Sequence, residues 1–221
     1  MHIHHDSRSF FLQGPVGQLE AILWTPTRAD VPNLGAVLCH PHPLFGGTLH
    51  NKVVYQAAKS LDALGIPVLR FNFRGAGLSA GAHDHGLGER GDVQAAIDFL
   101  AGEFPNAALL VGGFSFGCWV GLRVGCADPR VKELIGMGVP VNSSDFTYLE
   151  NCDKPKLFVQ GTSDEHGDWK KVEQLVAQIG GDTRLEFVQD ADHFFTGRLE
   201  HLDEAITSWL LQRHPELRKM K

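Results

Sequence analysis

The stretch Leu109-Leu110-Val111-Gly112-Gly113-Phe114-Ser115-Phe116-Gly117 decides how this sequence is interpreted. It begins as a short apolar run, which is typical of a buried strand, and then turns at glycines around a single serine. Residues 116–127 follow with the pattern of a helix. The stretch therefore predicts a strand, a sharp turn that presents Ser115, and a helix whose N-terminal amides point toward the same place.

The pentapeptide from Gly113 to Gly117 has the G-x-S-x-G form of a nucleophile elbow. A serine exposed on such a turn takes a strained backbone conformation, and the strand and the helix pass so closely that its neighbours two positions away must be very small. The pattern alone is not specific, because an ordinary glycine-rich turn between a strand and a helix has the same spelling. Its meaning depends on what else the chain supplies.

Composition predicts one soluble globular domain. The chain has 221 residues, of which 43% are hydrophobic and 21% charged, and its formal net charge is -6. The acidic balance argues against nucleic acid as a partner, and the absence of a long apolar run argues against a membrane. Residues 1–9 are expected to be a polar N-terminal segment, and residues 10–221 a single α/β domain in the cytoplasm.

The four cysteines show no close paired spacing that would predict a disulfide framework or a metal site. They are Cys39, Cys118, Cys126 and Cys152. In a cytoplasmic protein, reduced and buried thiols are the expected state of all four.

Strand and helix patterns alternate along most of the chain. An antiparallel hairpin is expected first, from residues 10–13 and 19–24. Further strands are expected at residues 36–39, 66–73, 131–139, 156–160 and 184–188, besides the one before Ser115, and helices at 51–64, 89–101, 116–127, 169–179 and 199–212. This alternation predicts a mostly parallel twisted sheet with helices on both faces. The segment between Val139 and Pro155 is too short for a helical cap domain.

Two loops contain groups that invite a cofactor or metal hypothesis. The glycine-rich loop 74–81 fits neither a dinucleotide nor a P-loop fingerprint, so we expect no nucleotide cofactor. The pairs His40/His42 and His83/His85 could supply metal ligands. The prolines around His40 and His42 favour a rigid loop at the end of a strand instead, and we expect no metal.

A serine nucleophile needs a base within hydrogen-bond reach and a third group that orients the base. His193 follows the last expected strand and Asp164 follows the strand before it, so both should open at the same sheet edge as Ser115. Asp164 could instead cap the helix that follows it. The other candidates for the acidic role are Glu165 and Asp168 nearby and Asp145 in the preceding loop. For His193 the alternative is a solvated loop histidine with no catalytic role.

Taken together, these motifs resemble those of the α/β-hydrolases, and in particular a small group without a cap that is related to dienelactone hydrolases and compact acyl-peptidase-like hydrolases. The resemblance covers nearly the whole chain after the first hairpin. It is carried by Gly113–Gly117, Gly161-Thr162-Ser163-Asp164, Ala191-Asp192-His193-Phe194-Phe195, His40-Pro41-His42-Pro43, Gly46-Gly47-Thr48, Asn51-Lys52-Val53-Val54 and Arg70-Phe71-Asn72-Phe73-Arg74-Gly75. Dienelactone hydrolases proper use a cysteine nucleophile, whereas this chain has a serine, which favours ordinary ester hydrolysis.

The resemblance implies a mechanism. Ser115 would attack an acyl carbonyl, His193 would carry the proton, and Asp164 would hold the imidazole. The oxyanion hole would use the backbone N–H of Phe116 and a second N–H from the loop after Pro43. Because prolines have no N–H, we expect Leu44 to supply it, with Phe45 as the alternative.

The implied substrate is a small-molecule ester with a short acyl group. The expected pocket is open and lined by Phe45, Phe194 and Phe195, together with Leu44 and Phe116, unless these residues simply pack under the loops. A non-catalytic binding protein with the same fold, or peptidase or thioesterase activity on the same residues, is the alternative. The sequence leaves the oligomeric state open.

Overall fold

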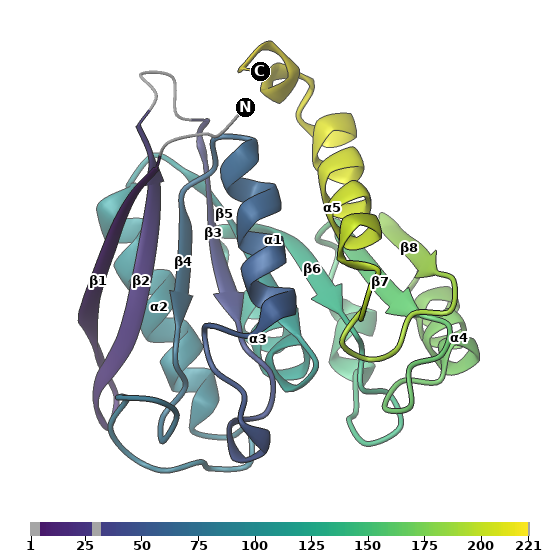
Figure 1. Cartoon of the computed structure of the whole chain (residues 1–221), viewed down its shortest axis with the longest axis horizontal. Helices are drawn as coiled ribbons and strands as arrows, with labels where there is room; N and C mark the ends of the chain where they lie inside the picture. The colour runs from purple at the N-terminus through teal and green to yellow at the C-terminus, as the bar shows by residue number, and fades with distance from the viewer. Residues whose placement is uncertain (1–4, 28–31, 221) are drawn as a thin grey trace.

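A computed structural model describes residues 5–27 and 32–220, and residues 1–4 of the expected N-terminal segment lie outside this range. The chain forms an eight-stranded sheet in the order β1-β2-β4-β3-β5-β6-β7-β8 (Figure 1). The strands are β1 (His5–Gly14), β2 (Gly17–Pro26), β3 (Leu34–Cys39), β4 (Val68–Phe71), β5 (Ala108–Phe114), β6 (Val131–Met137), β7 (Lys156–Gly161) and β8 (Thr183–Val188). From β4 to β8 neighbouring strands are parallel, whereas β1 and β2 form an antiparallel hairpin.

Strand β1 begins at His5, earlier than the start at Phe10 that the apolar pattern predicts. Its first half pairs with the end of β2, as in the pair His5 and Pro26. These residues are mostly polar and exposed, because β1 is an edge strand. Backbone pairing, which leaves no apolar signature in the sequence, holds this half of the strand in place.

The helices cover both faces of the sheet, as the alternation of patterns predicts (Figure 1). They are α1 (Lys52–Ala63), α2 (Glu89–Glu103), α3 (Phe116–Ala127), α4 (Trp169–Ile179) and α5 (Leu199–Arg213), with short 3₁₀ turns η1 (Pro43–Phe45), η2 (Thr147–Asn151) and η3 (Pro215–Met220). One buried cluster packs α1 and α5 against the sheet, and a second packs α2, α3 and α4 against the opposite face. Burial of these apolar faces is the main source of stability.

Among the helices of the described chain, none is both long enough and apolar enough to cross a membrane.

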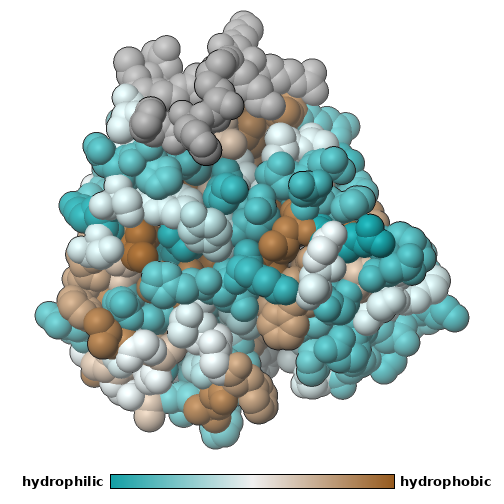
Figure 2. All heavy atoms as spheres, in the orientation of Figure 1, coloured by the Kyte–Doolittle hydropathy of each residue, from teal (hydrophilic) through white to brown (hydrophobic). Residues whose placement is uncertain are grey.

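The carboxyl ends of the parallel strands meet at one edge of the sheet, the lower edge in Figure 1. The loops after β3, β5, β6, β7 and β8 all gather there. Figure 2 shows apolar residues exposed at this lower edge. The turn η1 contributes Leu44 and Phe45, whose exposed fractions are 66% and 86%. The edge is therefore the place where side chains far apart in sequence can converge on a ligand.

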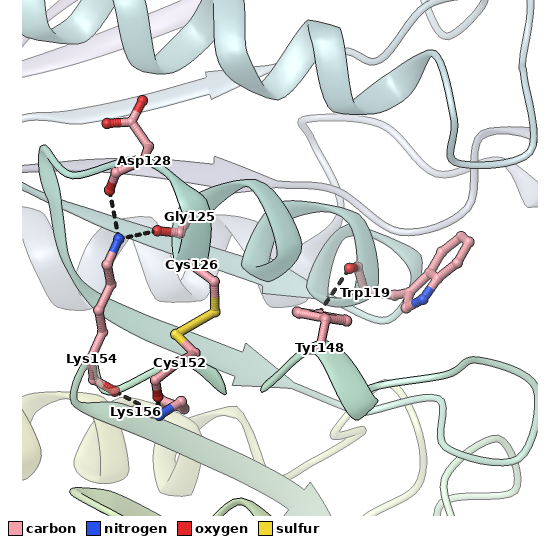
Figure 3. The surroundings of a disulfide bond; sticks show 8 residues. All are labelled: Trp119, Gly125, Cys126, Asp128, Tyr148, Cys152, Lys154 and Lys156. Atoms are coloured by element: carbon pink, nitrogen blue, oxygen red, sulfur yellow. Dashed lines mark hydrogen bonds between the residues drawn. A yellow bond between two sulfur atoms is a disulfide. The ribbon is translucent and has the colours of Figure 1, made fainter. Parts of the chain in front are cut away.

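The expectation of four reduced cysteines is wrong for two of them. Cys126, at the end of α3, and Cys152, after η2, form a disulfide with Cα atoms 5.7 Å apart (Figure 3). Cys39 and Cys118 remain free and buried. Packing between α3 and the segment before β7 brings the two sulfurs together, which their spacing in the sequence does not indicate. Because disulfides persist mainly in oxidising compartments, the pair does not support the predicted cytoplasmic location.

Candidate active site

Ser115 lies on the turn between β5 and α3, with φ 55° and ψ -120°. A positive φ with this ψ is strained for a residue with a side chain. A Cβ atom on Gly113 would collide with the backbone of Gly117, and one on Gly117 would collide with the carbonyl of Cys39. The two glycines therefore permit the close approach of strand and helix that the strained turn requires, as the sequence predicts.

His193 lies in the loop between β8 and α5 and is 3% exposed. Its Nε2 lies 2.9 Å from Oγ of Ser115, although the two residues are 78 positions apart. The imidazole packs against the ring of Phe114, with centroids 4.9 Å apart, and against Phe194. The apolar contacts hold the ring in place and leave its Nε2 edge facing the serine.

Asp164, after β7, accepts hydrogen bonds from several donors. Nδ1 of His193 lies 2.9 Å from Oδ1 and 2.8 Å from Oδ2. The side-chain amide of Gln160 donates to Oδ2, and the backbone N–H groups of His166 and Gly167 donate to Oδ1. The side chain of Asp164 is fully buried, so this set of donors replaces the water that the carboxylate loses on burial. The structure thus brings Ser115, His193 and Asp164 together in one chain of contacts.

The three competing carboxylates lie elsewhere. Asp168 caps α4 by accepting hydrogen bonds from the amides of its first turn. Asp145 accepts from the backbone and the hydroxyl of Thr147, and these bonds lower its pKa. Glu165 is exposed, and its carboxylate lies 3.8 Å from the ring of His166. In the described structure, none of these three carboxylates accepts a hydrogen bond from His193.

A cavity of about 490 Å³ opens above Ser115. It is lined by residues from the loops that follow the parallel strands, namely Pro41, His42, Phe45, Gly46, Gly47, Asn51, Ser115, Phe116, Pro140, Ser143, Ser144, His166, His193 and Phe194. Phe45 and Phe194 thus line the cavity. Phe195 does not: it is fully buried in the core beneath α1 and α5. Leu44 is exposed to solvent beside the cavity and is not part of its lining.

Two backbone N–H groups beside Ser115 are free to bind a ligand in the described structure. Within the described chain, the N–H groups of Phe116 and His42 donate no hydrogen bond, and both residues line the cavity. The N–H of Leu44 donates to Nδ1 of His42 at 3.3 Å, and that of Phe45 donates to the carbonyl of His42 at 3.1 Å. The two amides that the sequence favours as the second oxyanion donor are therefore used inside the loop itself.

Of the paired histidines, His40 takes a structural position. The ring of His40 is fully buried between two backbone groups: Nδ1 donates to the carbonyl of Pro41, and Nε2 accepts from the N–H of Phe73. Burial lowers the pKa of His40 to about 3. Burial also lowers the pKa of His42, and the neighbouring His83 adds to the effect. In residues 5–27 and 32–220, no three histidine, cysteine or acidic side chains are grouped so that they could hold a metal ion.

Comparison with known proteins places this geometry in a family. Residues 45–209 match the family described as "Alpha/beta hydrolase domain". This chain belongs to the α/β-hydrolase family. It is 37% identical to an alpha-beta serine hydrolase homologue from Coxiella burnetii, with 95% of this chain and 100% of that chain covered and a TM-score of 0.88.

Two further relatives support the family assignment. XC6422 from Xanthomonas campestris, described as a serine hydrolase without a lid, is 35% identical, with 94% of each chain covered and a TM-score of 0.87. An uncharacterized protein of Rickettsia prowazekii is 36% identical, with 91% of this chain and 87% of that protein covered. The α/β-hydrolase assignment and the lack of a cap are thus confirmed, whereas the relation to dienelactone hydrolases stays a prediction.

Sequence reasoning missed several groups around the site. It overlooked the amide of His42, because the choice of donor considered only residues after Pro43. It also missed the polar cavity wall of Ser143, Ser144 and His166. His166 lies two positions after Asp164, so its proximity to the site was open to inference. No comparable signal exists for Ser143 and Ser144, because their position depends on the path of the loop after β6.

Proposed function

We propose that this α/β-hydrolase is a serine hydrolase that cleaves small carboxylic esters through an acyl-enzyme intermediate. The proposal rests on the chain of contacts from Ser115 through His193 to Asp164 at an open cavity. A serine hydroxyl is a weak nucleophile at neutral pH and needs a base in hydrogen-bond contact, which is the role of His193. Asp164 holds the imidazole with Nε2 toward the serine and stabilises it when it becomes charged.

The reaction runs in two halves. Oγ of Ser115 attacks the carbonyl carbon while Nε2 of His193 takes the hydroxyl proton. The tetrahedral intermediate then expels the alcohol, which leaves with that proton. In the second half His193 takes a proton from water, the resulting hydroxide attacks the acyl carbon, and Ser115 regains its proton as the carboxylic acid departs.

The amides of Phe116 and His42 supply the oxyanion hole in this proposal. Both donors have no partner in the described structure, and both line the cavity beside Ser115. The amino end of α3 adds its positive dipole at the same place. His42 replaces Leu44 as the second donor, because the Leu44 amide already donates to the ring of His42.

The cavity favours small acyl groups. Its volume of about 490 Å³ must hold both sides of the ester, and Phe45, Phe116 and Phe194 supply its aromatic lining. We expect hydrolysis of p-nitrophenyl acetate and butyrate, with kcat/KM falling as the acyl chain lengthens toward palmitate. Ser115→Ala is the control for background hydrolysis. An equal kcat/KM from acetate to palmitate would contradict the size limit.

The type of bond that is cleaved can be determined by comparing three substrates with the same acyl group. Butyrate presented as an ester, as a thioester and as an amide gives a panel in which only the leaving atom changes. We expect the ester to have the highest kcat/KM relative to its uncatalysed rate. A thioester or an amide that exceeds it would reassign the substrate class and leave the roles of Ser115, His193 and Asp164 intact.

A further inference from the structure

We infer that the alcohol half of the substrate is uncharged and carries several hydroxyl groups, as a glycerol or sugar ester does. The inference rests on the proposed function and names the substrate class of the same site. It assigns Ser143, Ser144 and His166 as the groups that bind the alcohol.

The leaving alcohol must lie beside His193, because Nε2 of His193 returns the proton to its oxygen. The ring of His166 packs edge-on against that of His193, with centroids 4.6 Å apart. His166 also lines the cavity that holds Ser115. A substituent on the leaving oxygen therefore meets the imidazole of His166 as it extends along this wall.

The hydrogen-bonding groups of this wall are available to a ligand. Nε2 of His166 lies 3.8 Å from the carboxylate of Glu165, which is too far for a hydrogen bond. In the described structure the hydroxyl of Ser144 has no protein partner, and that of Ser143 reaches only the carbonyl of Pro140, at 3.5 Å. The wall can thus both donate hydrogen bonds to hydroxyl groups and accept them from these groups.

The serines and His166 form one wall because their loops are joined. The backbone N–H of Asn142 donates to the carbonyl of His166 at 3.4 Å, and its side-chain amide donates to the carbonyl of Glu165 at 3.4 Å. Nζ of Lys171 donates to Oδ1 of Asn142 at 3.1 Å. Asn142, which directly precedes Ser143, thus holds the two loops side by side.

The loop that carries the serines is also anchored to α3, the helix that follows Ser115. Figure 3 shows Tyr148 donating to the carbonyl of Trp119 and, farther along, the disulfide between Cys126 and Cys152. The indole of Trp119 donates in turn to the carbonyl of Asp145, the residue after Ser144. A wall fixed in this way binds a ligand with little loss of conformational freedom, which is what selectivity for hydroxyl groups needs.

The charge of the cavity narrows the class of alcohol. Its lining, as far as the structure describes the chain, contains no aspartate, glutamate, lysine or arginine. The nearby cations are Lys52, over the ring of Phe194, and Lys171, and their Nζ atoms donate hydrogen bonds to Thr196 and Asn142. A phosphate-bearing leaving group, as in coenzyme-A-type thioesters, would therefore meet no cation in the lining itself. The aromatic side chains of Phe45, Phe116 and Phe194 suit the acyl half. A neutral alcohol with several hydroxyls is the chemistry that matches the remaining wall.

The test uses two esters that share an acyl group, glyceryl 1-monobutyrate and propyl butyrate. Their alcohols have the same carbon chain and differ only in two hydroxyl groups. We expect kcat/KM to be at least about tenfold higher for the glyceryl ester, which corresponds to one or two net hydrogen bonds. A ratio near one or below would overturn the inference.

Substitutions in the wall test which residues cause the preference for the glyceryl ester. His166→Leu and Ser144→Ala should lower the ratio of the two kcat/KM values several-fold, and His166→Gln, which keeps a donor and an acceptor, should restore part of it. Phe45→Leu is the matched control on the aromatic side and should change both esters together. If the ratio of the two kcat/KM values is the same in His166→Leu, Ser144→Ala and the wild type, the assignment is overturned. If the wild type hydrolyses neither these esters nor p-nitrophenyl acetate, the proposed function fails and the inference fails with it.

Discussion

The side-chain amide of Gln160 donates a 2.8 Å hydrogen bond to Oδ2 of Asp164, the oxygen that also lies 2.8 Å from Nδ1 of His193. The same amide donates to the carbonyl of Gly167, and Oε1 of Gln160 accepts from the N–H of Val139. Gln160 is fully buried, so each of these bonds is protected from water. It therefore ties the loop after β6 to the loop that carries Asp164.

The first prediction separates Asp164 from its neighbour Asp168. Asp164→Asn should lower kcat by about 10³- to 10⁴-fold, because the amide no longer stabilises the charged imidazole or enforces its tautomer. Asp168→Asn is the matched control at the cap of α4. It should keep its turnover, since asparagine also caps helices. Hydrolysis of p-nitrophenyl acetate measures both, and a large loss in Asp168→Asn alone would reverse the assignment.

The second prediction tests the oxyanion donor at position 42. His42 has φ -54°, a value that proline adopts without strain, so His42→Pro removes the N–H with little change of backbone. We expect its kcat to be about 10²- to 10³-fold lower than that of His42→Ala, which lacks the ring and keeps the N–H. Circular dichroism of the two variants checks the fold. Equal kcat values in the two would remove this amide from the mechanism.

The third prediction concerns pH and His40. Its pKa in the folded chain is about 3, against about 6.5 unfolded, because burial disfavours the charged ring. Its contribution to stability is complete above pH 6.5 and is lost as the pH falls toward 3. Over this window it lowers the free energy of unfolding by at most about 1.4 kcal/mol per pH unit.

Two measurements check the titration of His40. Urea unfolding between pH 7 and pH 4.5 should give a flatter pH dependence for His40→Gln than for the wild type. Should that variant not fold, NMR of the wild-type imidazole gives the answer directly. The ring of His40 should stay neutral at pH 5, and a midpoint near pH 6.5 would contradict the prediction.

The fourth prediction concerns the disulfide. Cys152→Ser opens the link between α3 and the η2 segment and should lower the free energy of unfolding by about 3 kcal/mol, chiefly by freeing the unfolded chain. Dithiothreitol should lower the stability of the wild type similarly and have no further effect on the variant. Equal unfolding midpoints for oxidised wild type and Cys152→Ser would show that the pair contributes nothing.

The sequence was sufficient for the features that short-range patterns encode. The elbow around Ser115 and the bounds of α3 and α4 follow from glycine spacing and apolar periodicity. The meeting of Ser115, His193 and Asp164 follows from the rule that loops after parallel strands share one edge.

Features set by contacts between distant segments did not follow from the sequence. The disulfide depends on how α3 packs against the η2 segment, and the polar half of β1 depends on backbone pairing. Phe195 belongs to the core although the adjacent Phe194 lines the cavity. The backbone turns at Phe195, which has a φ of 51°, so the two side chains point in different directions. One residue's position in a loop does not fix the environment of the next.

Covalent labelling of Ser115 tests the central claim most directly. A fluorophosphonate probe added to the native protein should modify the tryptic peptide that contains Ser115, as read by mass spectrometry. The modification should be absent in Ser115→Ala and at least about a hundredfold slower in His193→Ala, since the two residues act as a unit. A folded wild-type protein that takes up no probe at Ser115, or that labels equally fast without His193, would contradict the account.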